Sequence, residues 1–319
     1  MMRALVTGGA GFIGSHVARL LLRQGWEVRV LDDLTTGSWS SLGEFASGCE
    51  LLKGDIRDRQ RIREACRGVD RVFHLAAMVS VADSVSDPTR CESINVQGTI
   101  TVLEAAQECG VGRVVFTSSA SVYGNAEKMP VTESDPILPL SPYAASKARG
   151  EQYCRLFSDN TELETVALRY FNVYGPGQTV NGGYAAVIPA FIDLARHNRE
   201  PVLFGDGEQT RDFVFVEDVA RANLAAATRP GVSGRSFNIG TGRGVSLLDL
   251  LRELRKITGS ALIPSFLAPR AGDVRHSTAD VTRAAEELGF HALCRLDEGL
   301  LRTVLHAISA SRGGAKAAA

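Results

Sequence analysis

Short apolar runs alternate with longer segments of helical periodicity through the first half of the chain. The apolar runs are bounded by glycine or charged residues, as buried strands are, and they fall at residues 4–7, 27–31, 71–75, 114–118 and 165–169. Segments with helical spacing of apolar residues separate them, at residues 12–24, 59–66, 95–109 and 143–159. Strands that alternate with helices form parallel sheets with right-handed crossovers. The pattern therefore predicts an α/β fold with a doubly wound parallel sheet of the Rossmann type.

This alternation ends at about residue 173. Glycine and proline crowd residues 175–183, and helical periodicity returns at residues 186–197, 217–228, 247–258 and 281–288. We expect two domains: residues 1–172, joined by segments around 210–240, and residues 173–308 as a smaller mixed α/β domain that binds the substrate. Small and polar residues dominate 309–319, which predicts a flexible tail.

Composition narrows the classes of function. The net charge of −1 offers no basic surface for nucleic acid or for a membrane. No apolar run approaches the roughly 18–20 residues that span a bilayer. The six cysteines have no paired spacing and form no cluster with histidines, which indicates free thiols and no metal site. We expect a soluble cytoplasmic protein without a metal, a nucleic-acid partner or a membrane partner.

A glycine-rich loop follows the first predicted strand and opens the first predicted helix. It reads Gly-Gly-Ala-Gly-Phe-Ile-Gly, and its residues at the spacing of a dinucleotide-binding loop are Gly8, Gly11, Phe12, Ile13 and Gly14. Glycines there permit a tight turn and a close approach of the backbone to a pyrophosphate. The N-terminus of the helix adds N–H donors. The loop therefore predicts a dinucleotide site.

Acidic residues end the second predicted strand. Asp32 lies there, 18 residues after Gly14. A carboxylate at this position accepts hydrogen bonds from the adenosine ribose and repels a 2′-phosphate, which favours NAD over NADP. Asp33 either shares this role or caps the turn. The pattern around Asp55 fits a turn or cap residue as well as an adenine contact.

A tyrosine and a lysine lie four residues apart on the predicted helix 143–159. Tyr143 and Lys147 share one face of that helix. An ammonium lowers the pKa of a neighbouring phenol from its ordinary value of about 10 and makes it a usable base. Ser119 lies in a hydroxyl-rich run at the end of the strand 114–118, where parallel sheets bind ligands. A serine there would hydrogen-bond the substrate oxygen from which the tyrosine takes a proton. Packing on a helix surface is the simpler explanation of a Tyr–Lys pair taken alone.

These motifs stand in one order along the chain. The glycine loop is followed by His-Leu-Ala-Ala at 74–77, Asn95, the hydroxyl-rich run at 117–124, Tyr143 with Lys147, Arg-Tyr-Phe-Asn at 169–172 and Asn-Ile-Gly-Thr-Gly at 238–242. Members of the extended short-chain dehydrogenase/reductase family carry the same motifs in the same order, and the chain resembles that family from its start to about residue 307. Within that family it is similar to the UDP-glucose/UDP-N-acetylglucosamine 4-epimerases.

The resemblance implies a role for each matching residue. Ser119, Tyr143 and Lys147 would be catalytic, with Tyr143 as the base. NAD would contact the glycine loop together with Asp32, Asp33, Asp55, Ile56, Leu75, Ala76, Ala77, Asn95, Lys147 and Tyr170. The nucleotide sugar would contact Asn172, Phe204, Arg211, Arg270, Asp273 and Ser277. Phe204 would lie near the uracil, and the two arginines would bind the diphosphate as planar bidentate donors.

Three positions qualify this match. Arg211 has an alternative in a surface ion pair with Asp212 or Glu208. Family members restricted to unacetylated sugars carry a tyrosine where this chain has Ser277, and a small residue leaves room for an N-acetyl group; a serine also suits a turn. Val79 replaces a lysine that some members carry, so one phosphate or sugar contact is missing.

The implied reaction is 4-epimerisation of a nucleotide-activated hexose. Tyr143 would take the proton of the 4′-hydroxyl while hydride passes to NAD, and the 4-keto sugar would rotate and take the hydride back on its other face. We expect UDP-N-acetylglucosamine and UDP-N-acetylgalactosamine as substrates, with UDP-glucose and UDP-galactose as further candidates. The family usually pairs helices 95–109 and 143–159 across a dimer axis, so we also expect a homodimer.

Other activities stay open as alternatives. Epimerisation of UDP-glucuronate, or another nucleotide-sugar oxidation of the family, uses the same catalytic residues. Dehydration is disfavoured because Ser119-Ala120-Ser121 lacks the carboxylates that dehydratases of this family carry there. A catalytically silent NAD-binding regulator is the alternative from another class, and the presence of Tyr143 and Lys147 argues against it.

Overall fold

A seven-stranded parallel sheet forms the centre of the protein in the computed structural model, which describes residues 1–179, 186–269 and 274–317. The strands follow the order β11, β6, β5, β4, β1, β2 and β3, with bounds β1 (Arg3–Thr7), β2 (Glu27–Asp32), β3 (Cys49–Lys53), β4 (Arg71–His74), β5 (Arg113–Ser119), β6 (Glu164–Tyr170) and β11 (Arg235–Ile239). Every pairing is parallel. The order reverses between β1 and β4, the kind of switch point where such sheets bind ligands. The predicted doubly wound sheet is confirmed.

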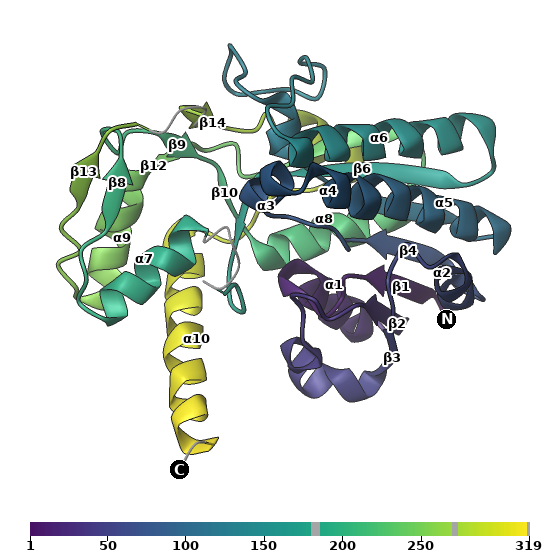
Figure 1. Ribbon diagram of the computed structural model, residues 1–319, viewed down its shortest axis with the longest axis horizontal. Helices are drawn as coiled ribbons and strands as arrows, with labels where there is room; N and C mark the ends of the chain where they lie inside the picture. The colour runs from purple at the N-terminus through teal and green to yellow at the C-terminus, as the bar shows by residue number, and fades with distance from the viewer. Residues whose placement is uncertain (180–185, 270–273, 318–319) are drawn as a thin grey trace.

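Helices cover both faces of this sheet (Figure 1). One face carries α1 (Phe12–Arg23) and α8 (Val216–Thr228), and the other carries α2 (Arg59–Cys66), α5 (Gly98–Glu108) and α6 (Pro142–Asn160). Each helix buries one apolar stripe against the strands, so two separate apolar clusters form, one on each face. Short segments connect these elements: η1 (Trp39–Gly48), α3 (Val81–Ser86), α4 (Pro88–Glu92), η2 (Ser93–Gln97) and η3 (Ala120–Tyr123).

A second part lies beside the sheet and is built by residues after β6 (Figure 1). Its helices are α7 (Val187–Arg196), α9 (Leu247–Thr258) and α10 (Leu296–Ala317), and the short η4 (Ala284–Leu288) precedes α10 in the chain. Its short strands pair as β7 (Asn172–Tyr174) with β10 (Phe213–Phe215), β8 (Val202–Phe204) with β13 (Ser265–Leu267), and β9 (Thr210–Arg211) with both β12 (Val245–Ser246) and β14 (His276–Ser277). A third apolar cluster joins α7, α9 and α10, and η4 packs with α8 on the sheet instead.

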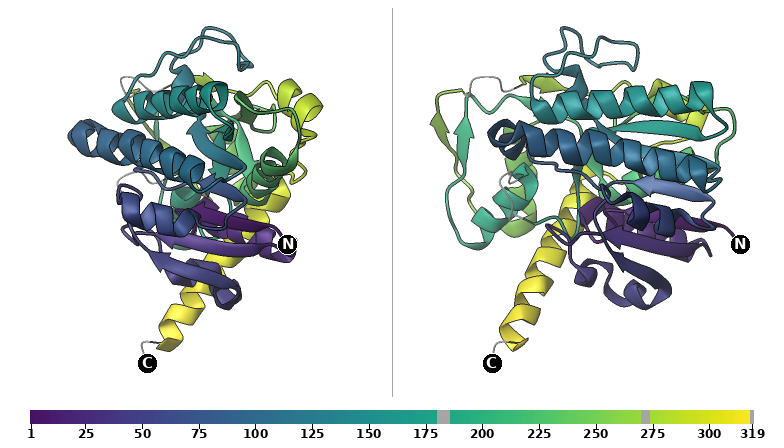
Figure 2. Two further views of the ribbon diagram at one scale, coloured as in Figure 1. Left: turned by 90° about the vertical axis from the view of Figure 1, so that its right-hand side faces the viewer. Right: turned by 45° about the vertical axis from the view of Figure 1, so that its right-hand side comes forward.

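Some elements have no counterpart among the segments that the pattern predicts. β3 is an edge strand whose Glu50, Leu51 and Lys53 are exposed, so it lacks a buried apolar run. β11 follows α8 and adds the outermost strand at the other edge, beside β6. α10 projects away from the sheet in both views of Figure 2, and it continues to Ala317, through most of the predicted tail.

Candidate active site

The glycine loop between β1 and α1 forms a cradle that fits a pyrophosphate. Gly8 has a φ of +69°, and a Cβ on it would lie 2.7 Å from the amide nitrogen of Ala76. A Cβ on Gly14 would overlap the carbonyl oxygen of Gly8. Gly11 caps α1 without a side-chain hydrogen bond, and the first turn from Phe12 carries no acidic residue. The loop therefore needs glycine for close packing, and it presents a helix N-terminus to an anion.

Asp32 at the end of β2 is bound to this cradle. Its carboxylate accepts hydrogen bonds from the amide nitrogens of Ala10 (3.0 Å) and Leu34 (2.9 Å). Burial raises the pKa of Asp32, and the two N–H donors oppose that shift. Asp33 instead accepts both the amide and the hydroxyl of Thr35 (2.8 Å each) at the surface. The turn-capping alternative for Asp33 therefore matches the contacts that the structure describes.

The contacts of Asp55 and Ile56 with the adenine end of NAD remain a prediction. Asp55 accepts the amide nitrogen of Arg57 (2.8 Å) and pairs with its guanidinium, which holds the pKa of Asp55 below its usual value. Ile56 is buried against Gly98 on α5. Asp55 thus forms a local turn, and its carboxylate is partly exposed beside the carboxyl end of the sheet.

Asn95 on η2 ties the segment after β4 to the helix of the Tyr–Lys pair. Its Oδ1 accepts from the amide of Met78 (2.8 Å), and its Nδ2 donates to the Ser146 hydroxyl (2.9 Å). Ser146 in turn donates to the carbonyl of Tyr143 (2.7 Å). Asn95 therefore supports α6 beside Leu75, Ala76 and Ala77, whose backbone follows β4 past the cradle.

His74 ends β4 and is buried between two hydroxyls. Its Nδ1 lies 2.7 Å from Thr7 Oγ1, and its Nε2 lies 3.0 Å from Thr99 Oγ1. Burial, with a smaller effect of the Lys147 charge, lowers the pKa of His74 to about 3. The imidazole is therefore neutral at physiological pH, and it links the ends of β1 and β4 to α5.

Tyr143 and Lys147 lie in the first turns of α6. Ser141 caps this helix by accepting the amide of Ala144 (3.1 Å). The Lys147 Nζ donates to the Thr117 carbonyl (2.8 Å) and lies 5.9 Å from the centre of the Tyr143 ring. Lys147 is 3% exposed, and burial lowers its pKa to about 8. The ammonium is thus held at the end of β5 beside the phenol ring.

Ser119 ends β5, two residues after that carbonyl. Its Oγ accepts the amide (3.2 Å) and the hydroxyl (2.9 Å) of Ser121, and the residue is partly exposed. Tyr170, at the end of β6, is buried, and its hydroxyl lies 3.2 Å from Thr117 Oγ1 and 2.7 Å from Asn223 Nδ2. Burial raises the pKa of Tyr170 to about 12. The end of β5 therefore carries Ser119 and binds Lys147 from α6, which lies beside the Tyr143 ring. Contact of Tyr170 with NAD remains a prediction.

The predicted sugar residues lie on the short strands of the second part. Asn172 begins β7, Phe204 ends β8, and Arg211 on β9 is the register partner of Ser277 on β14. Ser277 is partly buried and belongs to a strand, not to a turn. Arg270 and Asp273 lie outside the described residues.

Asp212 settles one of the alternatives for Arg211. This aspartate is fully buried, and its carboxylate accepts hydrogen bonds from Thr241, Gly242 and Ala279. A surface ion pair between Arg211 and Asp212 is therefore excluded.

Sequence reasoning did not single out Asp212, Thr117 or Asn223 as members of the site. Thr117 stands in the hydroxyl-rich run, and Asp212 directly follows Arg211, which are weak local signals. Asn223 lies in an unremarkable helical segment, 53 residues from Tyr170 along the chain. Its role is visible only in the folded chain.

Two negative findings concern the part of the chain that the structure describes. No group of three or more His, Cys, Asp or Glu side chains in it is arranged to hold a metal ion. None of its helices is long and apolar enough to cross a membrane.

A glycine cradle at the switch point of a parallel sheet is the arrangement of a dinucleotide-binding fold. The chain belongs to the NAD dependent epimerase/dehydratase family, whose model matches residues 4–240.

Known proteins of similar sequence and structure carry epimerase names. A putative UDP-glucose 4-epimerase of Methanocaldococcus jannaschii is 41% identical over 305 residues, covering 94% of this chain and 96% of that protein. A UDP-N-acetylglucosamine 4-epimerase from Methanobrevibacter ruminantium, solved in complex with UDP-N-acetylmuramic acid, superposes with a TM-score of 0.93 at 36% identity, over 97% of this chain and 99% of that one. A UDP-glucose 4-epimerase from Thermotoga maritima, solved with UDP-glucose, gives 0.92 at 39% identity, over 97% and 100%.

Proposed function

We propose that this protein is an NAD-dependent 4-epimerase of UDP-hexoses that acts through a 4-keto sugar. The observation that carries the proposal is the buried Lys147 ammonium, fixed by the Thr117 carbonyl and lying beside the Tyr143 ring. Family membership and the epimerase names of the similar proteins support it. The glycine cradle and Asp32 fit NAD, which would supply a hydride acceptor and donor at the sugar C4.

Each catalytic residue has one task in this reaction. Tyr143 accepts the proton of the sugar 4′-hydroxyl and later returns it. Lys147 stabilises the phenolate of Tyr143 by its positive charge, and the Thr117 carbonyl keeps the ammonium in place. Ser119 hydrogen-bonds the same sugar oxygen and orients it. Between the oxidation and the reduction at C4, the 4-keto sugar rotates so that its other face is presented, while its diphosphate stays bound.

The sugar end selects the substrate in this proposal. Arg211 and Arg270 bind the diphosphate, Phe204 lies near the uracil, and Asn172 and Asp273 contact the nucleotide sugar. Ser277 lies beside Arg211 in register, and its small side chain leaves room for a 2-acetamido group. We therefore assign UDP-N-acetylglucosamine and UDP-N-acetylgalactosamine as substrates, together with UDP-glucose and UDP-galactose. The M. ruminantium protein named as a UDP-N-acetylglucosamine 4-epimerase supports this choice.

Product analysis tests both levels of the proposal. The purified protein is incubated with UDP-N-acetylglucosamine, UDP-glucose or UDP-glucuronate, and products are identified by NMR. We expect the C4 epimers of the first two. Ser277→Tyr should abolish the reaction of the acetylated sugar and spare that of UDP-glucose, whereas Ser277→Ala should spare both. Equal loss of both reactions in Ser277→Tyr would contradict the role of Ser277 as a steric gate.

We also propose a cytoplasmic homodimer that pairs α5 and α6 of two copies. The six free cysteines are compatible with a reducing compartment, and Leu156 on α6 is 54% exposed. Light scattering should give twice the chain mass, and Leu156→Arg should shift the protein toward the monomer. A monomeric wild-type protein at micromolar concentration contradicts this assembly.

A further inference from the structure

Asp212 is a buried carboxylate at the sugar end of the site. It directly follows Arg211 and is 0% exposed. Its Oδ1 accepts the amide (2.8 Å) and the hydroxyl (2.6 Å) of Thr241, and its Oδ2 accepts the amides of Gly242 (3.0 Å) and Ala279 (3.2 Å). Burial raises the pKa of Asp212, and these four uncharged donors oppose the shift. A buried charge with this many donors holds its surroundings in one arrangement.

The hydrogen bonds of Asp212 join segments that are far apart in the chain. They connect the end of β9 to the turn after β11, 29 residues away, and to the residue two places after Ser277, 67 residues away. The backbone carbonyl of Asp212 also accepts the amide of Asn172 (2.9 Å). The three predicted sugar residues are therefore close to Asp212 along the chain or through a hydrogen bond. Asn172 donates its amide to Asp212, Arg211 directly precedes it, and Ser277 lies two residues before Ala279, which donates its amide to Asp212.

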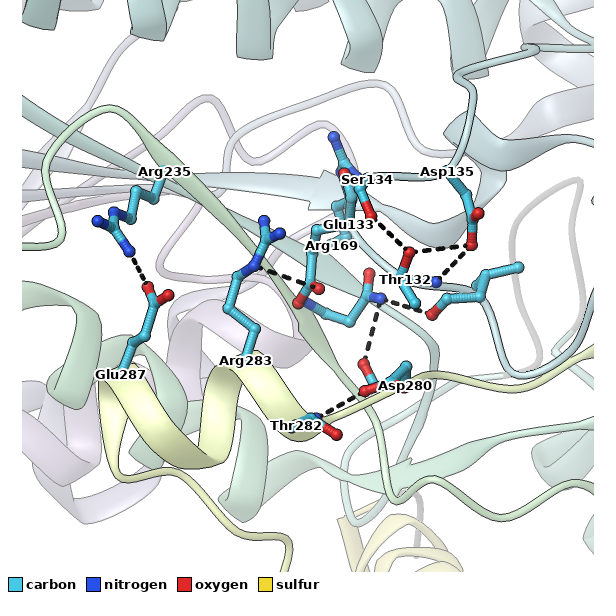
Figure 3. Close-up of polar contacts among 12 residues, drawn as sticks. Thr132, Glu133, Ser134, Asp135, Arg169, Arg235, Asp280, Thr282, Arg283 and Glu287 are labelled. Atoms are coloured by element: carbon cyan, nitrogen blue, oxygen red, sulfur yellow. Dashed lines mark hydrogen bonds and ion pairs between the residues drawn. The ribbon is translucent and has the colours of Figure 1, made fainter.

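The segment after Ser277 is also held from its other side. Val131 donates its amide to the Thr278 carbonyl (2.9 Å) and accepts the amide of Asp280 (2.7 Å). Figure 3 shows the neighbourhood of this contact, where Glu133 and Arg283 point toward one another and form an ion pair of 3.6 Å. The loop with Val131 leads into α6 and Tyr143. One side of the segment is thus bonded to the loop that precedes α6, and the other side is bonded to Asp212, next to Arg211.

We propose that Asp212 is a positioning residue for the nucleotide sugar, which holds Arg211 and Ser277 side by side. The inference rests on the proposed function, because it assigns Arg211 and Ser277 to the nucleotide sugar. Asp212 has no contact with substrate in this account. It acts on substrate binding through its neighbours, and the proton transfer at Tyr143 does not depend on it.

Asp212→Asn tests the proposal with almost no change of shape. One acceptor oxygen becomes an NH₂ group that faces N–H or O–H donors, so at least one bond is replaced by a repulsive contact. We expect the KM for UDP-glucose and the Kd for UDP to rise roughly 10-fold or more, the range of a lost charged hydrogen bond. The kcat should stay within about threefold and the content of bound NAD should be unchanged, because Tyr143 and the glycine cradle lie elsewhere.

Two further variants separate positioning from general loss of stability. Asp218→Asn on α8 is the matched control: Asp218 is also buried, and its Oδ2 accepts the amides of Leu293 (3.1 Å) and Cys294 (3.0 Å). It should lower the melting temperature without changing KM or UDP binding. Thr241→Val removes one donor and keeps the Asp212 carboxylate, so it should raise KM in the same direction by a smaller factor. It also decides the question if Asp212→Asn does not fold.

The outcomes distinguish this inference from the proposed function. A wild-type protein that epimerises no UDP-hexose rejects the proposed function, and UDP binding still tests Asp212. An active wild type whose Asp212→Asn and Thr241→Val variants keep normal KM and UDP affinity overturns the positioning role alone. An equal rise of KM in Asp218→Asn overturns it as well, since the effect would then come from general loosening.

Discussion

The proposed cofactor end and the proposed sugar end of this site are assembled over different distances along the chain. At the cofactor end, Gly8 packs against Gly14 six positions later, and Asp32 binds the amide of Ala10, 22 residues away. At the sugar end, Asp212 binds Ala279, 67 residues away, and Arg211 lies beside Ser277 through two-residue strands. The first arrangement is encoded within a short stretch of the chain. The second exists only after distant segments have met.

This difference indicates that substrate binding and catalysis depend on separate parts of the site. The proposed cofactor end and the proposed catalytic residues share the carboxyl edge of the seven-stranded sheet, whose inner strands are each paired on both sides. The sugar end depends on buried polar contacts between short strands. Changes at the first end should therefore affect turnover or NAD, and changes at the second should affect substrate affinity and choice. Substitutions at each end test that separation.

Tyr143→Phe should cause the largest loss, about 10²–10⁴-fold in turnover, because it removes the proton acceptor. Fold and bound NAD should be kept, since the backbone of Tyr143 makes the described contacts with Ser84 and Ser146. Turnover is measured by coupled assay and NAD by absorbance after denaturation. A variant with near-normal epimerisation would show that Tyr143 is not the base.

Lys147→Met should change how stability depends on pH. In the folded protein the Lys147 pKa is about 8, against 10.5 ordinarily, which corresponds to roughly 3 kcal/mol of unfavourable burial at neutral pH. Between these pH values the unfolded chain binds more protons, so wild-type stability rises with pH relative to the variant. Urea unfolding of both cofactor-free proteins from pH 7 to 10.5 measures the difference in their free energies of unfolding. Over this range the free energy of unfolding of the wild type should rise relative to that of the variant by up to about 3 kcal/mol. A constant difference contradicts the shifted pKa.

Asp32→Ala should weaken NAD binding by about 1.5–3 kcal/mol, the value of a charged hydrogen bond. Calorimetry with cofactor-free protein measures this, and KM for UDP-glucose at saturating NAD should be unchanged. Asp33→Ala is the paired variant, because the two aspartates are adjacent but only Asp32 is bound to the glycine loop. Tight NADP binding by the unmodified protein would contradict the proposed contact of Asp32 with the adenosine ribose.

Ser119→Ala should have the smallest effect, about tenfold in kcat, because it removes one hydrogen bond and leaves the base in place. The Ser119 hydroxyl accepts from Ser121 in the structure, so Ser121→Ala serves as a control for local disturbance. A larger loss of kcat in Ser121→Ala than in Ser119→Ala would show that Ser121, and not Ser119, contacts the substrate.

The fold could be predicted to the extent that its contacts are local. The five predicted strands of the sheet are present because each is a buried apolar run, and α1 begins at the glycine loop as expected. β3 was missed because an edge strand with exposed side chains has no such run. The same reasoning applies to the predicted catalytic residues: Ser119, Tyr143 and Lys147 stand in recognisable motifs, and the structure bonds Lys147 to the end of β5 beside the Tyr143 ring.

The sugar end could be predicted only by resemblance. Thr210–Arg211, Val245–Ser246 and His276–Ser277 are too short to show any period, and their pairing depends on residues elsewhere. The buried bonds of Asp212 and Asn223 leave no signal in a single sequence, since aspartate and asparagine are just as common in turns and helix caps. Physical reasoning from sequence therefore proposed the catalytic residues, and only the structure shows the contacts that position them.

Retention of a C4 label tests the central claim most directly. The proposed reaction removes a hydride from C4 of the sugar and returns it to the same carbon within one binding event. UDP-glucose carrying deuterium at C4 is incubated with the purified protein in ordinary water, without added NAD, and the UDP-galactose formed is analysed by mass spectrometry and NMR. We predict that the product keeps its deuterium at C4. Loss of the label to solvent, or an absolute need for added NAD in protein that retains its cofactor, would contradict the account.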